Sequence, residues 1–129
     1  MNGCYSMDKP DTGAVFVCDS DELKEAGVGV RFEVRTAAAS TPLPAFVVRS
    51  QGQVVAYLNQ CRHVAMELDW QAGHFFDHER RYLMCATHGA LYEPQTGLCV
   101  SGPCRGQSLI PVPVIEKEHK IWWLSDLPL

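Results

Sequence analysis

The chain is organised around two short stretches, Cys61-Arg62-His63 and Cys85-Ala86-Thr87-His88. Each offers one thiol and one imidazole, separated by two positions in the first stretch and three in the second. Because such a spacing spans one tight turn, each loop can aim both side chains to the same side. Two loops of this kind make a four-ligand site. Two sulfur and two nitrogen ligands can hold a [2Fe-2S] cluster in which two His replace two Cys on one iron.

Zinc is the chemical alternative to iron at these four residues, because two Cys and two His are a common tetrahedral zinc set. Zinc sites of that kind usually place both Cys on one element and both His on another. Here each loop carries one of each. The alternation favours iron, and zinc stays open as the second interpretation.

The strand pattern around the two loops predicts an all-β fold. Short apolar and β-branched runs, bounded by turn residues every eight to twelve positions, are typical of a sandwich or barrel. We expect strands at residues 14–18, 28–34, 45–49, 54–59, 81–84, 90–92, 98–100, 109–116 and 120–124. Residues 37–44 are expected to be a loop, and residues 19–25 a capped helical turn.

Aromatic residues in two places call for an interpretation. Trp70, Phe75 and Phe76 lie in the long connection over residues 64–81, where we interpret them as packing residues. Trp122 and Trp123 are adjacent in an expected strand, so their side chains point to opposite faces of the sheet. We expect one of the two in the core and the other exposed as a contact for a partner.

Bulk properties indicate one soluble domain over residues 1–129, with residues 1–13 as a loosely ordered lead-in. An apolar content of 47% is enough for a core. The net charge of −4 gives no electrostatic reason to expect nucleic acid or anionic membrane as a partner.

No signal peptide and no membrane-spanning apolar run is evident, which favours a cytoplasmic protein. The six cysteines are then metal ligands plus spare thiols, the latter being Cys4, Cys18, Cys99 and Cys104.

The paired motif, followed by the loop Ser101-Gly102-Pro103, resembles the Rieske family over roughly residues 28–124. The resemblance implies three antiparallel sheets and a small cluster-binding subdomain, at about residues 60–105, that carries both loops. It implies that Cys61 and Cys85 hold the inner iron of a [2Fe-2S] cluster, and that His63 and His88 hold the outer, redox-active iron. The residues implied to surround the cluster are Gly89, Ala90, Tyr92 and Pro103.

Departures from the family pattern point to a low reduction potential. High-potential members join the two loops by a disulfide, and the matching residues here are Met66 and Thr87. Those members also have a Ser whose hydroxyl bonds a bridging sulfide, where this chain has Ala90. Tyr92 is retained, and its hydroxyl is expected to reach the Cys61 sulfur. One lost donor and one retained donor favour the low end of the Rieske range, roughly −150 mV upward.

The resemblance implies a one-electron carrier, a ferredoxin that takes electrons from a reductase and passes them to a redox enzyme such as an oxygenase. It implies no catalytic residue and no small-molecule substrate. An oxygenase catalytic subunit would need a further domain with a 2-His-1-carboxylate iron site, for which this length leaves no room. The alternatives are a small Rieske-type subunit of a larger redox complex, similar to that of nitrite reductase, and a zinc-binding structural module.

Overall fold

The computed structural model describes residues 13–36, 41–61, 66–69, 71–87 and 89–125. Nine strands and one short 3-10 helix account for the regular structure in these ranges, which contain no α-helix. In chain order the elements are β1 Ala14–Asp19, η2 Ser20–Glu22, β2 Val30–Val34, β3 Leu43–Ser50, β4 Gln53–Leu58, β5 Leu83–Met84, β6 Leu91–Tyr92, β7 Cys99–Ser101, β8 Val114–Lys117 and β9 Lys120–Leu124. The prediction of an all-β fold is confirmed.

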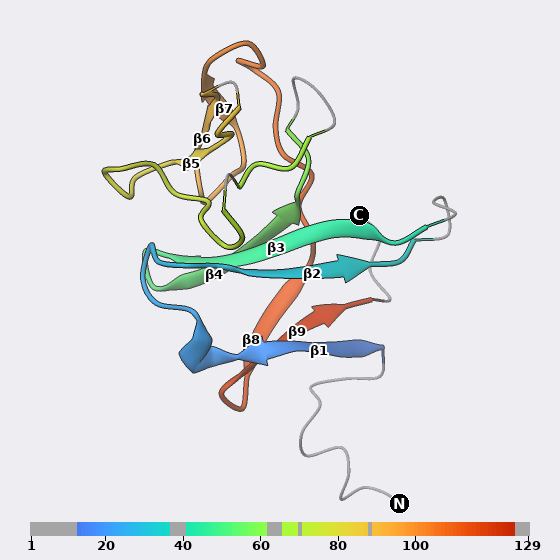
Figure 1. Cartoon of the computed structure of the whole chain (residues 1–129). Coiled ribbons are helices and arrows are strands. Elements are labelled where there is room, and N and C mark those ends of the chain that lie inside the picture. Colours follow the sequence, from blue (N-terminus) through green and yellow to red (C-terminus); the bar gives the residue numbers. More distant parts are fainter. Residues whose placement is uncertain (1–12, 37–40, 62–65, 70, 88, 126–129) are drawn as a thin grey trace, which may run out of the picture.

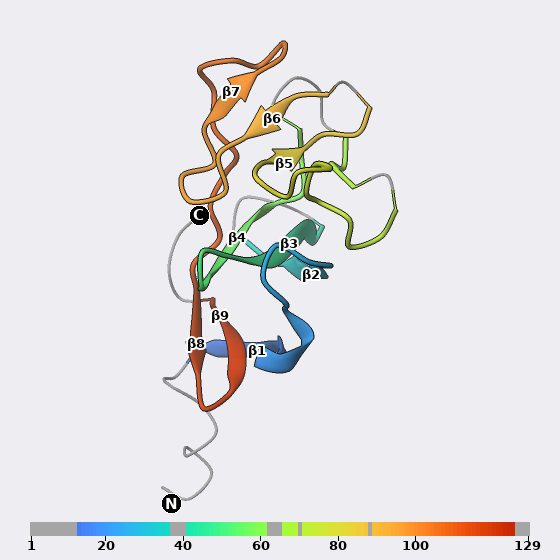
Figure 2. The ribbon, with the colours of Figure 1, turned by 90° about the vertical axis from the view of Figure 1, so that its left-hand side faces the viewer.

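The strands form three antiparallel sheets of three strands each, in the orders β1-β9-β8, β2-β3-β4 and β5-β6-β7. Figure 1 shows the first sheet at the bottom of the molecule, the second across the middle and the third at the top. The turned view in Figure 2 shows the same order, with the long connection before β5 lying beside the third sheet. The two cysteine stretches therefore belong to the end of the molecule farthest from β1.

Two of the hairpins have the same kind of tight, two-residue turn. Gln51 and Gly52, between β3 and β4, have φ angles of 54° and 76°. Glu118 and His119, between β8 and β9, have φ angles of 58° and 62°. Two successive residues in the left-handed region match the twist of antiparallel strands, which is the usual geometry of a two-residue hairpin.

The strand β3 is buried on both faces and separates two cores. Phe46 and Val48 belong to the core shared with the third sheet, whereas Ala45 and Val47 belong to the core shared with the first. This alternation follows from the two-residue period of a strand. The middle sheet is thus the wall against which the cysteine-bearing end is built.

Several expected boundaries need correction. The strand β3 begins at Leu43, inside the expected loop over residues 37–44, because Leu43 and Pro44 pair with β2. The closing strand β8 begins only at Val114, since residues 109–113 cross between the two cores, where Leu109 and Val112 are buried in different clusters. The expected lead-in over residues 1–13 lies outside the described residues, except for Gly13.

The expectation that one tryptophan of the pair is exposed is wrong. Trp122 is 3% exposed and Trp123 is 8% exposed. Their side chains do go to opposite faces, but Phe16 of β1 packs edge-on against Trp122, with ring centroids 5.9 Å apart. The Trp122 indole N–H also donates to the Lys117 carbonyl oxygen at 3.2 Å. Phe16, rather than a tryptophan, is the exposed aromatic of this sheet, at 48%.

Candidate metal centre

The two cysteine loops begin with the same backbone closure. The Cys61 N–H donates to the Met66 carbonyl oxygen at 2.7 Å, and the Cys85 N–H donates to the Ala90 carbonyl oxygen at 2.9 Å. In each case the acceptor lies five residues after the cysteine. The described ends of the two stretches therefore close in the same way, with each cysteine at the base. The intervening His63 and His88 lie outside the described residues.

Backbone bonds hold the second loop beside the chain that leaves the first. The Ala86 N–H donates to the Leu68 carbonyl oxygen at 3.0 Å, and the Met84 N–H donates to the Phe75 carbonyl oxygen at 2.8 Å. Gly89 has a φ of 70° and donates its N–H to the Cys85 carbonyl oxygen at 2.7 Å. A residue with a Cβ adopts that φ at a cost, so Gly89 suits this turn.

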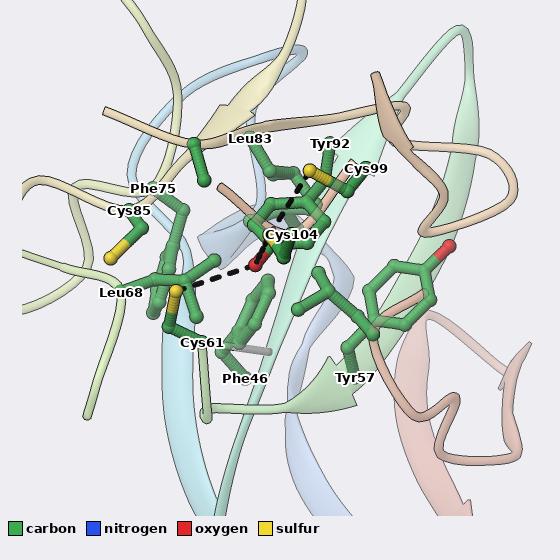
Figure 3. Close-up of a cluster of buried hydrophobic side chains, with 13 residues drawn as sticks. Phe46, Tyr57, Cys61, Leu68, Phe75, Leu83, Cys85, Tyr92, Cys99 and Cys104 are labelled. Atoms are coloured by element: carbon green, nitrogen blue, oxygen red, sulfur yellow. Dashed lines mark hydrogen bonds between the residues drawn. The ribbon is translucent and has the colours of Figure 1, made fainter. Parts of the chain in front are cut away.

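The two cysteine side chains are buried together. Cys61 is 3% exposed and Cys85 is 0% exposed, and both belong to the core below the third sheet. Figure 3 shows both sulfur atoms at one edge of that group of buried side chains. The Tyr92 hydroxyl lies 3.4 Å from the Cys61 Sγ, as expected for this tyrosine.

The loop after β7 lies against the second cysteine loop. A Cβ built on Gly102 would come within 2.8 Å of the Ala90 Cα, so only glycine allows this approach, and its φ of 105° also favours glycine. Ala90 is fully buried beneath the contact. Pro103 follows on the exposed side of the same loop.

Asn59 is a supporting residue that sequence reasoning missed. Its buried side chain accepts a hydrogen bond from the Leu68 N–H at 2.8 Å and donates one to the Asp69 Oδ1 at 3.1 Å. Arg31 of β2 also faces Asp69, with its Nε 3.4 Å from the Oδ2. Asn59 therefore ties the chain before Cys61 to the chain after it. The feature of the sequence that could have indicated this role is an amide residue at the end of an expected strand, just before an expected ligand loop.

The described residues fit an iron–sulfur group in their donor chemistry. They supply two buried thiols at the bases of the two loops, together with a tyrosine hydroxyl on one sulfur. Within the described ranges, no group of three or more His, Cys, Asp or Glu side chains gathers as a metal site. The remaining ligands of the expected set, His63 and His88, belong to the parts of the loops that are not described.

Comparison with known protein families decides the class. A model of the Rieske [2Fe-2S] domain matches residues 13–118. The chain belongs to the Rieske [2Fe-2S] domain family. Membership implies a Rieske-type [2Fe-2S] cluster as the cofactor, and a Rieske domain is an electron-transfer module. No curated protein sequence matches this Rieske protein significantly.

Solved structures share the fold of this Rieske protein. A chain in a complex of reduced oxygenase and oxidised ferredoxin of carbazole 1,9a-dioxygenase is 22% identical, with a TM-score of 0.66, and the match covers 92% of this chain and 99% of that one. The ferredoxin of carbazole 1,9a-dioxygenase from Nocardioides aromaticivorans IC177 is 24% identical, with a TM-score of 0.66 and coverage of 87% and 97%. The terminal oxygenase from Novosphingobium sp. KA1 is 20% identical, with a TM-score of 0.66, and the match covers 87% of this chain but only 29% of the oxygenase.

Proposed function

We propose that this Rieske protein is a one-electron carrier, a ferredoxin that passes electrons from a reductase to a redox enzyme such as an oxygenase. The observation that carries the proposal is the extent of the structural match. The match takes in 97% of a dioxygenase ferredoxin, but only 29% of a terminal oxygenase. The fold thus corresponds to nearly the whole of a known electron carrier, and this correspondence supports electron carriage as the function.

The proposed ligands are Cys61, His63, Cys85 and His88. The matched closure of the two loops and the burial of both cysteines support this set. When bound, the cluster would accept and release one electron, with its potential raised by the two imidazole ligands. The chain's own contribution is to bury the two thiols, to hold the two loops in register and to direct the Tyr92 hydroxyl at the Cys61 sulfur.

The proposed partners are proteins: a reductase as donor and an oxygenase or similar enzyme as acceptor. The solved complex of an oxygenase with a ferredoxin supports an acceptor of this class. The net charge of −4 favours a partner with a basic docking face.

In the described residues, no helix is long and apolar enough to cross a membrane. We propose a cytoplasmic carrier, built as one domain with residues 60–105 as its cluster-binding part.

We also propose that the cluster of this Rieske protein has a low reduction potential. Ala90 provides no hydroxyl toward the cluster, and Met66 and Thr87 replace the loop-joining cysteines of high-potential members. Tyr92 leaves one donor in place, at 3.4 Å from the Cys61 Sγ. A measured potential above about +150 mV, in the upper half of the Rieske range, would contradict this part of the proposal.

A reversible redox titration of the purified protein tests the carrier function. We expect one-electron reduction and reoxidation without loss of absorbance, followed by rapid electron transfer from the reduced protein to a separate one-electron acceptor such as cytochrome c. A subunit of a larger complex, the second candidate, would transfer electrons only within a stable assembly that survives purification. A colourless protein with stoichiometric zinc would support the zinc module instead.

A further inference from the structure

A row of four side chains leads from the Cys61 sulfur away from the metal site. The Tyr92 hydroxyl oxygen lies 3.4 Å from the Cys61 Sγ and 3.0 Å from the Cys104 Sγ. The Cys104 Sγ is in turn 3.0 Å from the Cys99 Sγ. The Cys99 thiol reaches the Ser101 carbonyl oxygen at 3.3 Å. Figure 3 shows the row, with dashed lines that run from the Cys61 sulfur past the Tyr92 hydroxyl to the Cys99 sulfur.

The row is closed to water at its centre. Tyr92, Cys99 and Cys104 are each at most 2% exposed. Burial, together with the bond to Cys104, raises the pKa of the Cys99 thiol to about 11, so Cys99 keeps its proton at neutral pH. A buried donor or acceptor without a partner is costly, so the protons of the row must be distributed among its contacts.

The number of protons in the row depends on whether Cys61 binds a metal. When Cys61 is a thiol, the row holds four protons for the four contacts described above. All four contacts are then satisfied if each group donates to the next, ending at the Ser101 carbonyl oxygen, which can only accept.

A metal-bound cysteine is a thiolate, which can only accept. Three protons then remain for the four contacts. A hydrogen bond to a charged sulfur is stronger than one between neutral groups, so the Tyr92 hydroxyl donates to Cys61. The Tyr92 oxygen then faces the Cys104 Sγ at 3.0 Å with its lone pairs, and a Cys104 thiol that donates to it satisfies both atoms.

We propose that Cys104 is a positioning residue of the cluster site, whose thiol donates to the Tyr92 hydroxyl oxygen and so fixes the Tyr92 proton on the Cys61 sulfur. The donors of the row thus reverse direction when Cys61 takes up the metal. Cys99 then donates to Cys104, and the contact left without a proton is the one to the carbonyl oxygen of Ser101, a residue that is exposed. The proposal rests on Cys61 being a ligand, as proposed above.

The expected consequence is on the reduction potential. A donor directed at a ligand sulfur stabilises the added negative charge of the reduced state and raises the potential. Removing the Cys104 donor by Cys104→Ala should lower the equilibrium constant for reduction by about threefold to tenfold, where tenfold is about 59 mV for one electron. Cys104→Ser keeps a donor of similar size, and its potential should stay at or above that of the parent protein.

A double-mutant cycle on the loaded protein tests whether Cys104 acts through Tyr92. Potentials are measured for the parent, Cys104→Ala, Tyr92→Phe and the double variant, with Cys18→Ala as a control in the other core, where Cys18 is 2% exposed. We expect Cys104→Ala to shift the potential in the parent but not in Tyr92→Phe. An equal shift in both backgrounds, or no shift, would overturn the inference.

Three other results would each contradict the inference. If Cys104→Ala fails to fold, Cys104→Ser decides, because a potential below that of the parent would contradict a donor role. A parent protein that binds no iron would overturn the proposed function together with this inference. A loaded parent whose potential is insensitive to Cys104→Ala would overturn the inference alone.

Discussion

The ring of Phe46 stacks on the ring of Phe75, with centroids 3.9 Å apart and planes 13° apart. Phe46 lies in β3 of the middle sheet, and Phe75 lies in the connection between the two cysteine loops. Both side chains are fully buried. This stacked pair therefore anchors the cysteine-bearing end of the molecule to the sheet beneath it.

Replacing Phe75 by alanine should destabilise the protein by about 3–5 kcal/mol, because a buried ring is lost and a cavity is left against Phe46. Denaturant unfolding of the cluster-loaded protein measures the change. Phe16→Ala is the matched control, since Phe16 is 48% exposed. We expect the control to lose much less stability. Equal losses in the two variants would show that the stacked pair does not anchor this end.

Replacing Asn59 by alanine should cost about 1–3 kcal/mol, because the buried Leu68 N–H loses its acceptor. The first cysteine loop is held at its base by this side chain, so the variant should also release iron to a chelator faster. Asn59→Asp keeps the acceptor oxygen but sets a carboxylate beside Asp69. The stability of Asn59→Asp should fall as well, because the two carboxylates repel each other. An unchanged stability in Asn59→Ala would show that Asn59 does not brace the loop.

Glu116 should contribute stability that depends on pH. The Arg49 guanidinium donates two hydrogen bonds to the Glu116 carboxylate, at 3.0 and 2.8 Å, and this pairing lowers the pKa of Glu116 below its ordinary 4.5. A lowered carboxyl pKa stabilises the folded state above the ordinary pKa, and the contribution is lost as the pH falls through the lowered one.

Glu116→Gln should therefore cost about 0.5–1 kcal/mol at neutral pH, the range for a well-formed but partly exposed pair. The difference from the parent should shrink as the pH falls from the ordinary pKa of 4.5 through the lowered pKa of the folded state, because the carboxyl is then protonated in both states. Unfolding curves at several pH values measure it. Glu33→Gln, at an exposed position in β2, is the control. A cost that is the same at every pH would assign the effect to packing.

Ala90→Ser should raise the reduction potential, because the resemblance places a hydroxyl donor at this position in high-potential members. Ala90 is fully buried beside the second cysteine loop. We expect an equilibrium constant for reduction about threefold to tenfold higher, where tenfold is about 59 mV. Ala86→Ser, a change in the same loop at a partly exposed position, is the control. An unchanged potential in Ala90→Ser would mean that the hydroxyl does not reach the cluster.

The sequence allowed much of the fold to be predicted, because its signals are local. Two-residue alternation and turn residues located the strands on either side of Gly52 and of Gly97. The strand boundaries at Leu43 and Val114 were missed, since they depend on pairing with distant strands. The burial of both Trp122 and Trp123 was missed for a similar reason. A strand's period gives the face of each side chain, but not what covers that face.

At the metal site, the motif identified residue types and spacing but not their support. The contact of Tyr92 with Cys61 was expected and is confirmed at 3.4 Å. The bracing by Asn59 and the row through Cys104 depend on chain segments that only the fold brings together. The ligand roles of Cys61, His63, Cys85 and His88 all stay predictions, and both histidines lie outside the described residues.

We propose that Cys61, His63, Cys85 and His88 together hold a redox-active [2Fe-2S] cluster. The electron paramagnetic resonance spectrum of the purified protein, before and after reduction with dithionite, tests for this cluster. We predict no signal in the oxidised protein and a rhombic signal, of one spin per chain, in the reduced protein. A protein that gives no such signal after reduction would contradict the proposal.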